Sequence, residues 1–174
     1  MVAVLSWLLL RSTEPKHLKA LTDLRSVPDY FLRDFEITSM DEIGNPRYRL
    51  TASSMQHYSH DDSSRLVNPS MIVFDDELEA WKIKSDEGHL QHHGETLFLG
   101  GDVLITRLNV VRRDSMKIST RDLTVKTGVE YAETSQPVEI VSDLGITTAI
   151  GMQMYYKNRV LHLLNKVRGK YDSQ

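Results

Sequence analysis

The chain has 174 residues, of which 40% are hydrophobic and 26% are charged. These values are typical of one folded soluble domain and exclude a disordered chain. The formal net charge is −3 and cysteine is absent, which excludes a basic field for nucleic acid, thiol catalysis, cysteine-bound zinc and disulfides.

Residues 1–11 carry a short apolar run that ends at Arg11. A helix that spans a bilayer needs about 20 apolar residues, and this run is about half as long. Trp7 and Arg11 are residue types that favour a membrane interface, so we expect residues 1–11 to form a partial membrane anchor. A short apolar arm, buried or lying on a membrane, is the alternative. Residues 12–28 are expected to form a linker with some helix.

From Tyr30 onward, apolar and polar residues alternate with a period of two in several short runs. Examples are Arg47–Ala52, Trp81–Ser85 and Met116–Thr120. This alternation predicts half-buried β-strands, and turn signals recur between the runs at short intervals. The sequence therefore predicts an all-β domain over residues 29–174.

The strand pattern also repeats along the chain. The run that begins at Trp81 returns 35 residues later at Met116 (116 − 81 = 35), and a weaker copy begins 33 residues earlier at Tyr48 (81 − 48 = 33). Units of two strands cannot bury their apolar faces alone. We therefore expect antiparallel strands stacked into one continuous body.

The last segment changes its period. Val160, Leu163, Leu164 and Val167 follow the spacing i, i+3, i+4, i+7. This spacing is typical of one face of an α-helix. The pattern predicts a short amphipathic C-terminal helix over residues 158–168 that covers the last strands.

Catalytic and metal-binding patterns are weak. The stretches His57–Asp62 and His89–His93 lie beside predicted turns, and side chains at odd spacing on a strand point to opposite faces, so we expect no metal site. The adjacent acids of Asp75–Glu77 do not resemble two carboxylates held across a cleft. No nucleophile elbow, phosphate loop or dinucleotide fingerprint is present. We expect a protein that is not an enzyme, with no catalytic residue, no cofactor and no nucleic-acid partner.

Several stretches together resemble the LptC family, the bitopic inner-membrane component of lipopolysaccharide export in Gram-negative bacteria. The matching pieces are Pro28–Leu32, Phe35–Thr38, Gly44–Ala52, Leu66–Pro69, Trp81–Ser85, Leu99–Val103, Ile118–Leu123, Ala132–Val138, Gly145, Gly151–Met152 and Val167–Tyr171. Each piece alone is weak, but their order and spacing over most of the chain make the resemblance specific. The first residues depart from the family pattern of a complete transmembrane helix preceded by positive charge.

The resemblance implies an open β-jellyroll that holds lipid acyl chains. It implies that lipopolysaccharide arrives from the LptF/LptG permease, which works with the ATPase LptB, and is passed to the periplasmic bridge protein LptA. It also implies a single-pass protein of the inner membrane with its β domain in the periplasm.

Each predicted strand offers one apolar face to the expected interior, where a buried methylene gains about 0.8 kcal/mol. For any one of these residues, packing a closed core is the alternative role. The expected lipid-binding interior residues are Phe35, Ile37, Tyr48, Leu50, Leu66, Trp81, Ile83, Leu99, Val103, Ile105, Met116, Ile118, Val138 and Ile140.

The two strand edges at the ends of the stack are expected to bind partners by strand addition. The N-terminal edge, for the permease, contains Tyr30, Phe31, Phe35 and Ile37. The C-terminal edge, for the bridge protein, contains Gly145, Ile146, Thr148, Gly151, Met152 and Met154. The uncharged, β-prone run that begins at Gly145 is a poor surface unless something covers it.

Two other function classes remain open. One is a non-catalytic β-repeat interaction scaffold of the periplasm that has a closed core and binds no lipid. The other is a carbohydrate-active β-jellyroll enzyme, which would need an acid pair across a groove.

Overall fold

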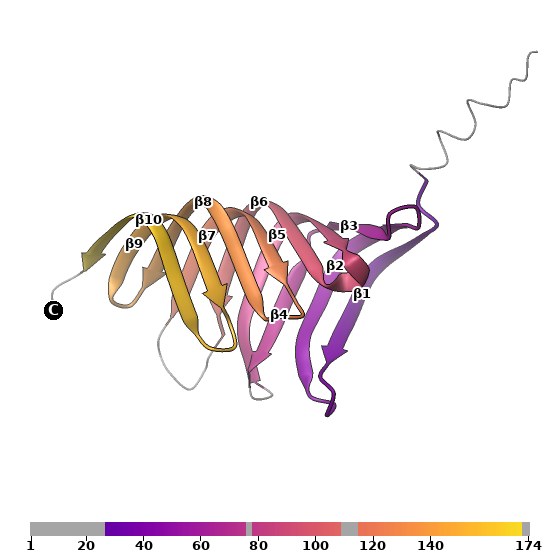
Figure 1. Ribbon diagram of the computed structural model, residues 1–174, viewed down its shortest axis with the longest axis horizontal. Helices are drawn as coiled ribbons and strands as arrows, with labels where there is room; N and C mark the ends of the chain where they lie inside the picture. Colours follow the sequence, from indigo (N-terminus) through magenta and orange to yellow (C-terminus); the bar gives the residue numbers. More distant parts are fainter. Residues whose placement is uncertain (1–26, 76–77, 109–114, 172–174) are drawn as a thin grey trace, which may run out of the picture.

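The computed structural model describes residues 27–75, 78–108 and 115–171. The strands are β1 (Tyr30–Met40), β2 (Pro46–Tyr58), β3 (Ser63–Val67), β4 (Ser70–Asp75), β5 (Leu78–Gln91), β6 (Thr96–Arg107), β7 (Met116–Lys126), β8 (Tyr131–Ser142), β9 (Gly145–Tyr155) and β10 (Val160–Tyr171). One 3-10 turn, η3 (His92–Gly94), joins β5 to β6. The strands form one antiparallel sheet stacked along the long axis, with β1 at one end and β10 at the other (Figure 1). The all-β prediction is confirmed.

The expected anchor and nearly all of the expected linker, as well as Asp76 and Glu77 of the acidic cluster, lie outside the described residues. Across the part of the chain that the structure describes, no helix combines the length and hydropathy needed to cross a bilayer.

The sheet folds into two walls because its long strands turn near their middles. In β2, Tyr48–Thr51 pairs with β4, whereas Ser54–Tyr58 pairs with β3. At the corresponding point, the register shifts between β5 and β6, β6 and β7, β7 and β8, and β8 and β9. Such bulges bend a strand and re-aim its side chains. We call this line of bends the corner; the strands arch over it in Figure 1.

Backbone conformation marks the corner in strand after strand. Residues with positive φ on this line are Asp34, Asn68, Gly101, Asp122, Gly151 and Lys166. Left-handed backbone is open to glycine and tolerated by Asp and Asn, which suits them to bulges. Between β6 and β7, the Gly101 N–H donates to Asp122 Oδ1 at 3.1 Å, which ties two neighbouring bends together.

The side chains between the two walls form the core. Leu50, Ile83, Leu99, Val103 and Ile118 are all 0–3% exposed, as the alternating pattern predicts. The repeat is also visible, because Trp81 lies near the start of β5 and Met116 at the start of β7, two strands further along the stack. The register of these strands is therefore confirmed.

The prediction of a C-terminal helix is wrong. Residues Val160–Tyr171 form strand β10, which pairs with β9 over its whole length. Leu161 and Leu163 pack against the core, but a bulge between Asn165 and Arg168 shifts the register of the second half. This shift spaces the apolar residues of a two-sided edge strand in a way that imitates the helical period.

Candidate functional site

The apolar interior is one continuous cluster between the walls. Of the expected interior residues, Leu50, Leu66, Trp81, Ile83, Leu99, Val103, Ile105, Ile118, Val138 and Ile140 belong to this cluster and are buried. Phe35, Tyr48 and Met116 are partly buried against it, while Ile37 is exposed. The walls are in contact, so the protein's own side chains fill this interior in the structure.

The interior reaches the surface at the end formed by β1. Ile37 pairs with the buried Leu50, so both side chains lie on the inner face, yet Ile37 is 41% exposed because β1 is the last strand. A cavity of about 260 Å³ opens between the walls there, lined by Ile37, Tyr48, Met55 and Leu90 together with polar groups. We call these four residues the N-terminal mouth.

Two residues of the N-terminal mouth are absent from the sequence-based list of interior positions. Met55 lies three residues after the inward Ala52, and Leu90 lies five after Ser85, because both strands pass the corner in between. A strict period of two therefore places both on the wrong face. The signal that could have found them is a pair of small or polar residues that interrupts the alternation, Ser53-Ser54 in β2 and Asp86-Glu87 in β5, after which apolar residues again alternate with polar ones.

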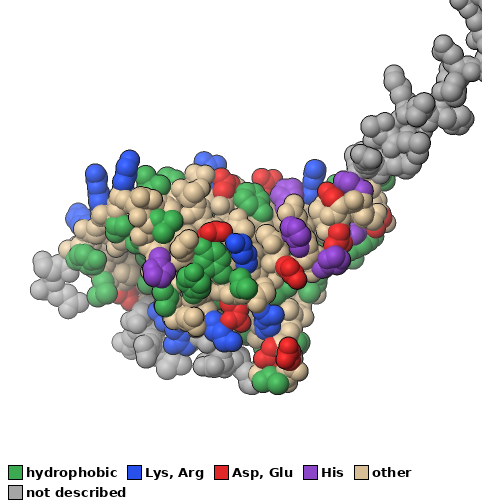
Figure 2. All heavy atoms as spheres, in the orientation of Figure 1, with side chains coloured by type: hydrophobic (Ala, Val, Ile, Leu, Met, Phe, Trp, Pro, Cys, Tyr) green, Lys and Arg blue, Asp and Glu red, His purple; other side chains and the backbone are tan. Residues whose placement is uncertain are grey.

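Polar groups gather on one side of the N-terminal mouth, where Figure 2 shows histidine and acidic side chains close together. His57 Nε2 lies 3.9 Å from Asp62 Oδ1 and 4.0 Å from Asp29 Oδ2, and its ring stacks on Tyr30. His93 Nε2 lies 3.3 Å from Asp62 Oδ2. The two histidine stretches thus meet at Asp62, because the β2–β3 and β5–β6 turns are neighbours, which reading each stretch alone does not reveal.

Removal of divalent ions is expected to leave the melting temperature unchanged. Within the described ranges, no group of three or more His, Asp or Glu side chains is arranged to hold a metal ion. The measurement is thermal unfolding with and without a chelator. A clear fall in the melting temperature would reveal a structural ion.

Two buried tyrosines with raised pKa values make the protein less stable at alkaline pH. Burial, followed by the bond that Tyr131 donates to Glu133 Oε2 at 2.8 Å, raises the pKa of Tyr131 to about 12. Burial and the nearby Glu130 carboxylate also raise the pKa of Tyr156. An unfolded tyrosine has a pKa of about 10, so the folded state disfavours the phenolate and loses stability as the pH rises from about 10 to about 12.

We expect the melting temperature to fall across this alkaline window and to fall less steeply in Tyr131→Phe and Tyr156→Phe. The measurement is thermal unfolding at a series of pH values. The exposed Tyr171 supplies the control, because Tyr171→Phe should follow the parent protein. An unchanged slope in both test variants would contradict the assignment.

The structure places one of the two free strand edges where the sequence predicts it and the other elsewhere. At the N-terminal edge, β1 is the last strand, and Tyr30 and Phe31 are exposed on it. At the other end, β10 covers β9, so the expectation that β9 forms the free edge is wrong. Gly145, Ile146, Thr148, Gly151, Met152 and Met154 all lie on this inner strand, and Gly151, Met152 and Met154 are buried. The free C-terminal edge is β10.

Known proteins resemble this chain in sequence and in fold. Residues 1–172 match the family described as "Lipopolysaccharide-assembly, LptC-related". The lipopolysaccharide export system protein LptC of Escherichia coli K12 is 24% identical over 128 residues, which cover 73% of this chain and 66% of that protein. The same values hold for LptC of Shigella flexneri.

A solved structure shows the same fold. LptH of Pseudomonas aeruginosa, described as the LptA-homologous periplasmic component of the lipopolysaccharide transport device, superposes with a TM-score of 0.58 at 7% identity. The superposition covers 72% of this chain and 95% of LptH, which confirms the expected β-jellyroll architecture. On the match over residues 1–172, the chain belongs to the LptC-related family of lipopolysaccharide-assembly proteins.

Proposed function

We propose that this protein carries lipopolysaccharide by holding its acyl chains between the two walls. One observation carries the proposal: the continuous apolar core ends at the N-terminal mouth in Ile37, an inward-facing apolar side chain that no opposite wall covers. Acyl chains that enter there would continue along faces that are already apolar. Each buried methylene would contribute about 0.8 kcal/mol, so several chains would bind strongly without any catalytic group.

The proposal assigns a partner to each end of the stack. The β1 edge receives lipid from the LptF/LptG permease with its ATPase LptB, and the β10 edge passes it to an LptA-like bridge protein. Both edges offer the unpaired main-chain groups that strand addition needs. In this arrangement residues 1–11 anchor the protein in the inner membrane, and residues 29–174 form the periplasmic domain. Residues 12–28 are the linker that connects the anchor to this domain.

A closed core supports a second candidate, an interaction scaffold that binds no lipid. The interior cluster is buried and filled by its own side chains, as in an ordinary β-sandwich. Under this alternative the two edges still bind partners, but nothing enters between the walls.

Photo-crosslinking separates the two candidates. A photoreactive residue at Ile37 is expected to capture lipopolysaccharide in membranes that make it, whereas one at Leu104 is not. Both side chains are 41% exposed, but Leu104 lies between the buried Val103 and Ile105 and therefore points outward. Equal capture at the two positions, or none at Ile37, would favour the scaffold.

A further inference from the structure

The hairpin turns line the free margins of the two walls. The turn 41–45 between β1 and β2 lies on the margin of one wall, which we call the first rim. The turns 92–95, 127–130 and 156–159 follow one another along the margin of the other wall, the second rim. Hydrogen bonds join the turns of the second rim, because Thr127 Oγ1 donates to Gly94 O at 2.9 Å and Tyr156 N–H donates to Glu130 O at 3.2 Å.

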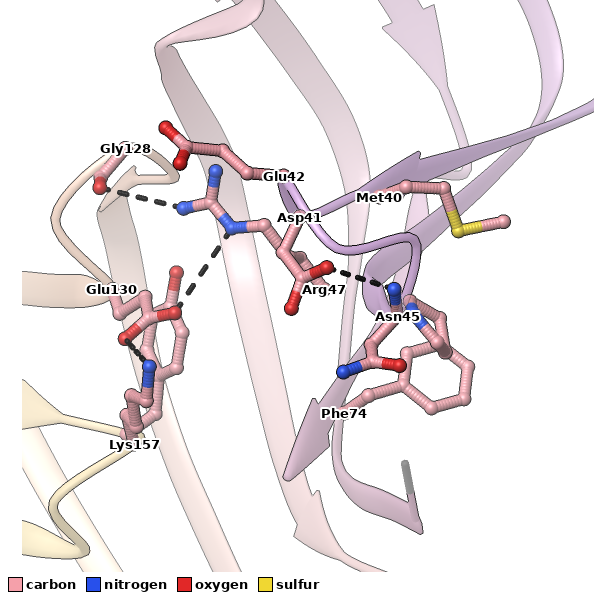
Figure 3. Close-up of a pocket in the computed structure, with 11 residues that line it drawn as sticks. Met40, Asp41, Glu42, Asn45, Arg47, Phe74, Gly128, Glu130 and Lys157 are labelled. Atoms are coloured by element: carbon pink, nitrogen blue, oxygen red, sulfur yellow. Dashed lines mark hydrogen bonds and ion pairs between the residues drawn. The ribbon is translucent and has the colours of Figure 1, made fainter. Parts of the chain in front are cut away.

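Arg47, next to the first rim, reaches the second rim (Figure 3). Its Nη2 donates to Thr127 O at 2.6 Å and to Gly128 O at 3.3 Å, and its Nε lies 4.0 Å from Glu130 Oε1. Lys157 Nζ, 3.6 Å from Glu130 Oε2, holds that carboxylate from the other side. These contacts join residues about 80 positions apart in the chain, across the opening that faces away from the corner.

The setting makes these contacts stronger than ordinary surface pairs. The side chains of Arg47 and Glu130 are only 30% and 27% exposed, and the buried Tyr156 lies beside them. Hydrogen bonds from a guanidinium are about twice as strong as neutral ones, and partly buried charges are screened less by salt. Arginine also suits the geometry, because its planar guanidinium presents Nη2 to the two carbonyl oxygens and Nε to the Glu130 carboxylate at the same time.

We propose that Arg47 is a clasp that holds the two walls together beside the N-terminal mouth, and that lipid enters when this clasp opens. The inference rests on the proposed function. Because the interior residues are buried against one another, an acyl chain enters only if the walls separate. Apart from the break between β3 and β4, the strands run through the corner, so the walls separate by turning about it, and the rims move furthest. A contact between the rims therefore restrains the separation of the walls more effectively than a contact nearer the corner.

The clasp is tested first without lipid. Because the chain has no cysteine, Glu42→Cys and Asn158→Cys place one spin label on each rim of the full-length protein. Arg47→Ala is expected to lengthen and broaden the distance between the labels. Arg121→Ala is the matched control, because Arg121 pairs with Asp102 on the exposed outer surface at 3.3 Å and crosses no opening. An unchanged distance in Arg47→Ala would overturn the clasp.

Loading is tested with purified lipopolysaccharide and a photoreactive residue at Leu50, which is 3% exposed and which acyl chains reach only between the walls. Arg47→Ala is expected to raise the initial rate of capture about tenfold, the scale of one lost charge-assisted hydrogen bond, and Arg47→Lys less. In the double-cysteine protein that keeps Arg47, a cleavable bismaleimide that joins the two rims should lower the initial rate of capture at least about tenfold, with recovery after cleavage. A covalent bridge holds the rims more firmly than the hydrogen bonds of Arg47 do. This locked form keeps Arg47, so it shows whether opening of the rims limits lipid capture even if Arg47→Ala folds poorly.

The outcomes distinguish failure of the clasp from failure of the proposed function. If the parent captures lipid and the locked form captures it equally fast, the clasp is overturned while the proposed function stands. If the parent captures no lipopolysaccharide at Ile37 or at Leu50, the proposed function and the gating role fall together, whereas capture at Ile37 alone overturns only the gating role. The label distances then still report whether Arg47 holds the rims.

Discussion

Replacing Ile105 with aspartate is expected to unfold the domain, whereas the same change at its neighbour Leu104 should leave it folded. Ile105 is fully buried between the walls, and Leu104, next to it on β6, points outward. An unpaired carboxylate in an apolar core costs several kcal/mol, which is comparable with a typical total stability of about 5–15 kcal/mol. An exposed substitution usually changes stability by about 0.5 kcal/mol or less.

Urea unfolding of the two variants measures this difference, and Ile105→Val gives a milder third point. Loss of one buried methylene should cost about 0.5–1.5 kcal/mol and leave the slope of the transition unchanged. Similar stabilities for Ile105→Asp and Leu104→Asp would show that the walls do not meet over β6. The result bears on function as well, because Ile105 lies on the face proposed to meet acyl chains.

The all-β fold and the inner face of most strands follow from the sequence because alternation is a local property. Within one half of a strand, as in Trp81–Ser85, each side chain's face is fixed by its parity. The 35-residue offset between Trp81 and Met116 adds the order of the stack, since repeating hairpins place equivalent strands two apart. These signals need no knowledge of distant contacts.

At the corner, alternation in the sequence no longer predicts which side chains face inward. The corner changes the parity within a strand, so Met55 and Leu90 lie on the inner face although counting from Ala52 or Ser85 places them outside. In β5 the change falls at a register shift between Ser85 and Glu87, whereas β2 bends there as it passes from β4 to β3. The resemblance adds the fold and its expected role, but not the bends. The contact of Arg47 with Thr127 joins distant turns, and no local pattern records which turns the twist of the sheet brings together.

The final strand shows how far a bulge can mislead. In β10 the inward Leu161 and Leu163 precede the bulge, and Leu164 and Val167 lie on the exposed side. Both faces of this edge strand therefore carry apolar residues, and their combined spacing matches a helix. Pairing with β9 decides the conformation, which is a tertiary effect that outweighs the local pattern.

This correction changes the expected effect of Gly151→Arg. If β9 were a free edge, the arginine would only obstruct a partner strand. In the structure Gly151 has φ +80°, and a Cβ built there lies 3.0 Å from Leu164 Cδ1 on β10. The variant therefore adopts left-handed backbone, at about 1–2 kcal/mol, and also crowds β10, at about 1–3 kcal/mol.

We expect Gly151→Arg to lower the free energy of unfolding by about 2–5 kcal/mol, the sum of these two costs, and to loosen β10 from β9. Gly101→Arg is the matched control, because Gly101 has φ +74° but open space around its Cβ position, so it bears the backbone cost alone. The measurement is urea unfolding of both variants, together with a pull-down by the LptA-like bridge protein. Because β10 is the free edge, the pull-down should weaken for Gly151→Arg and persist for Gly101→Arg. Loss of the bridge protein by Gly151→Arg at unchanged stability would instead place β9 itself in the partner contact.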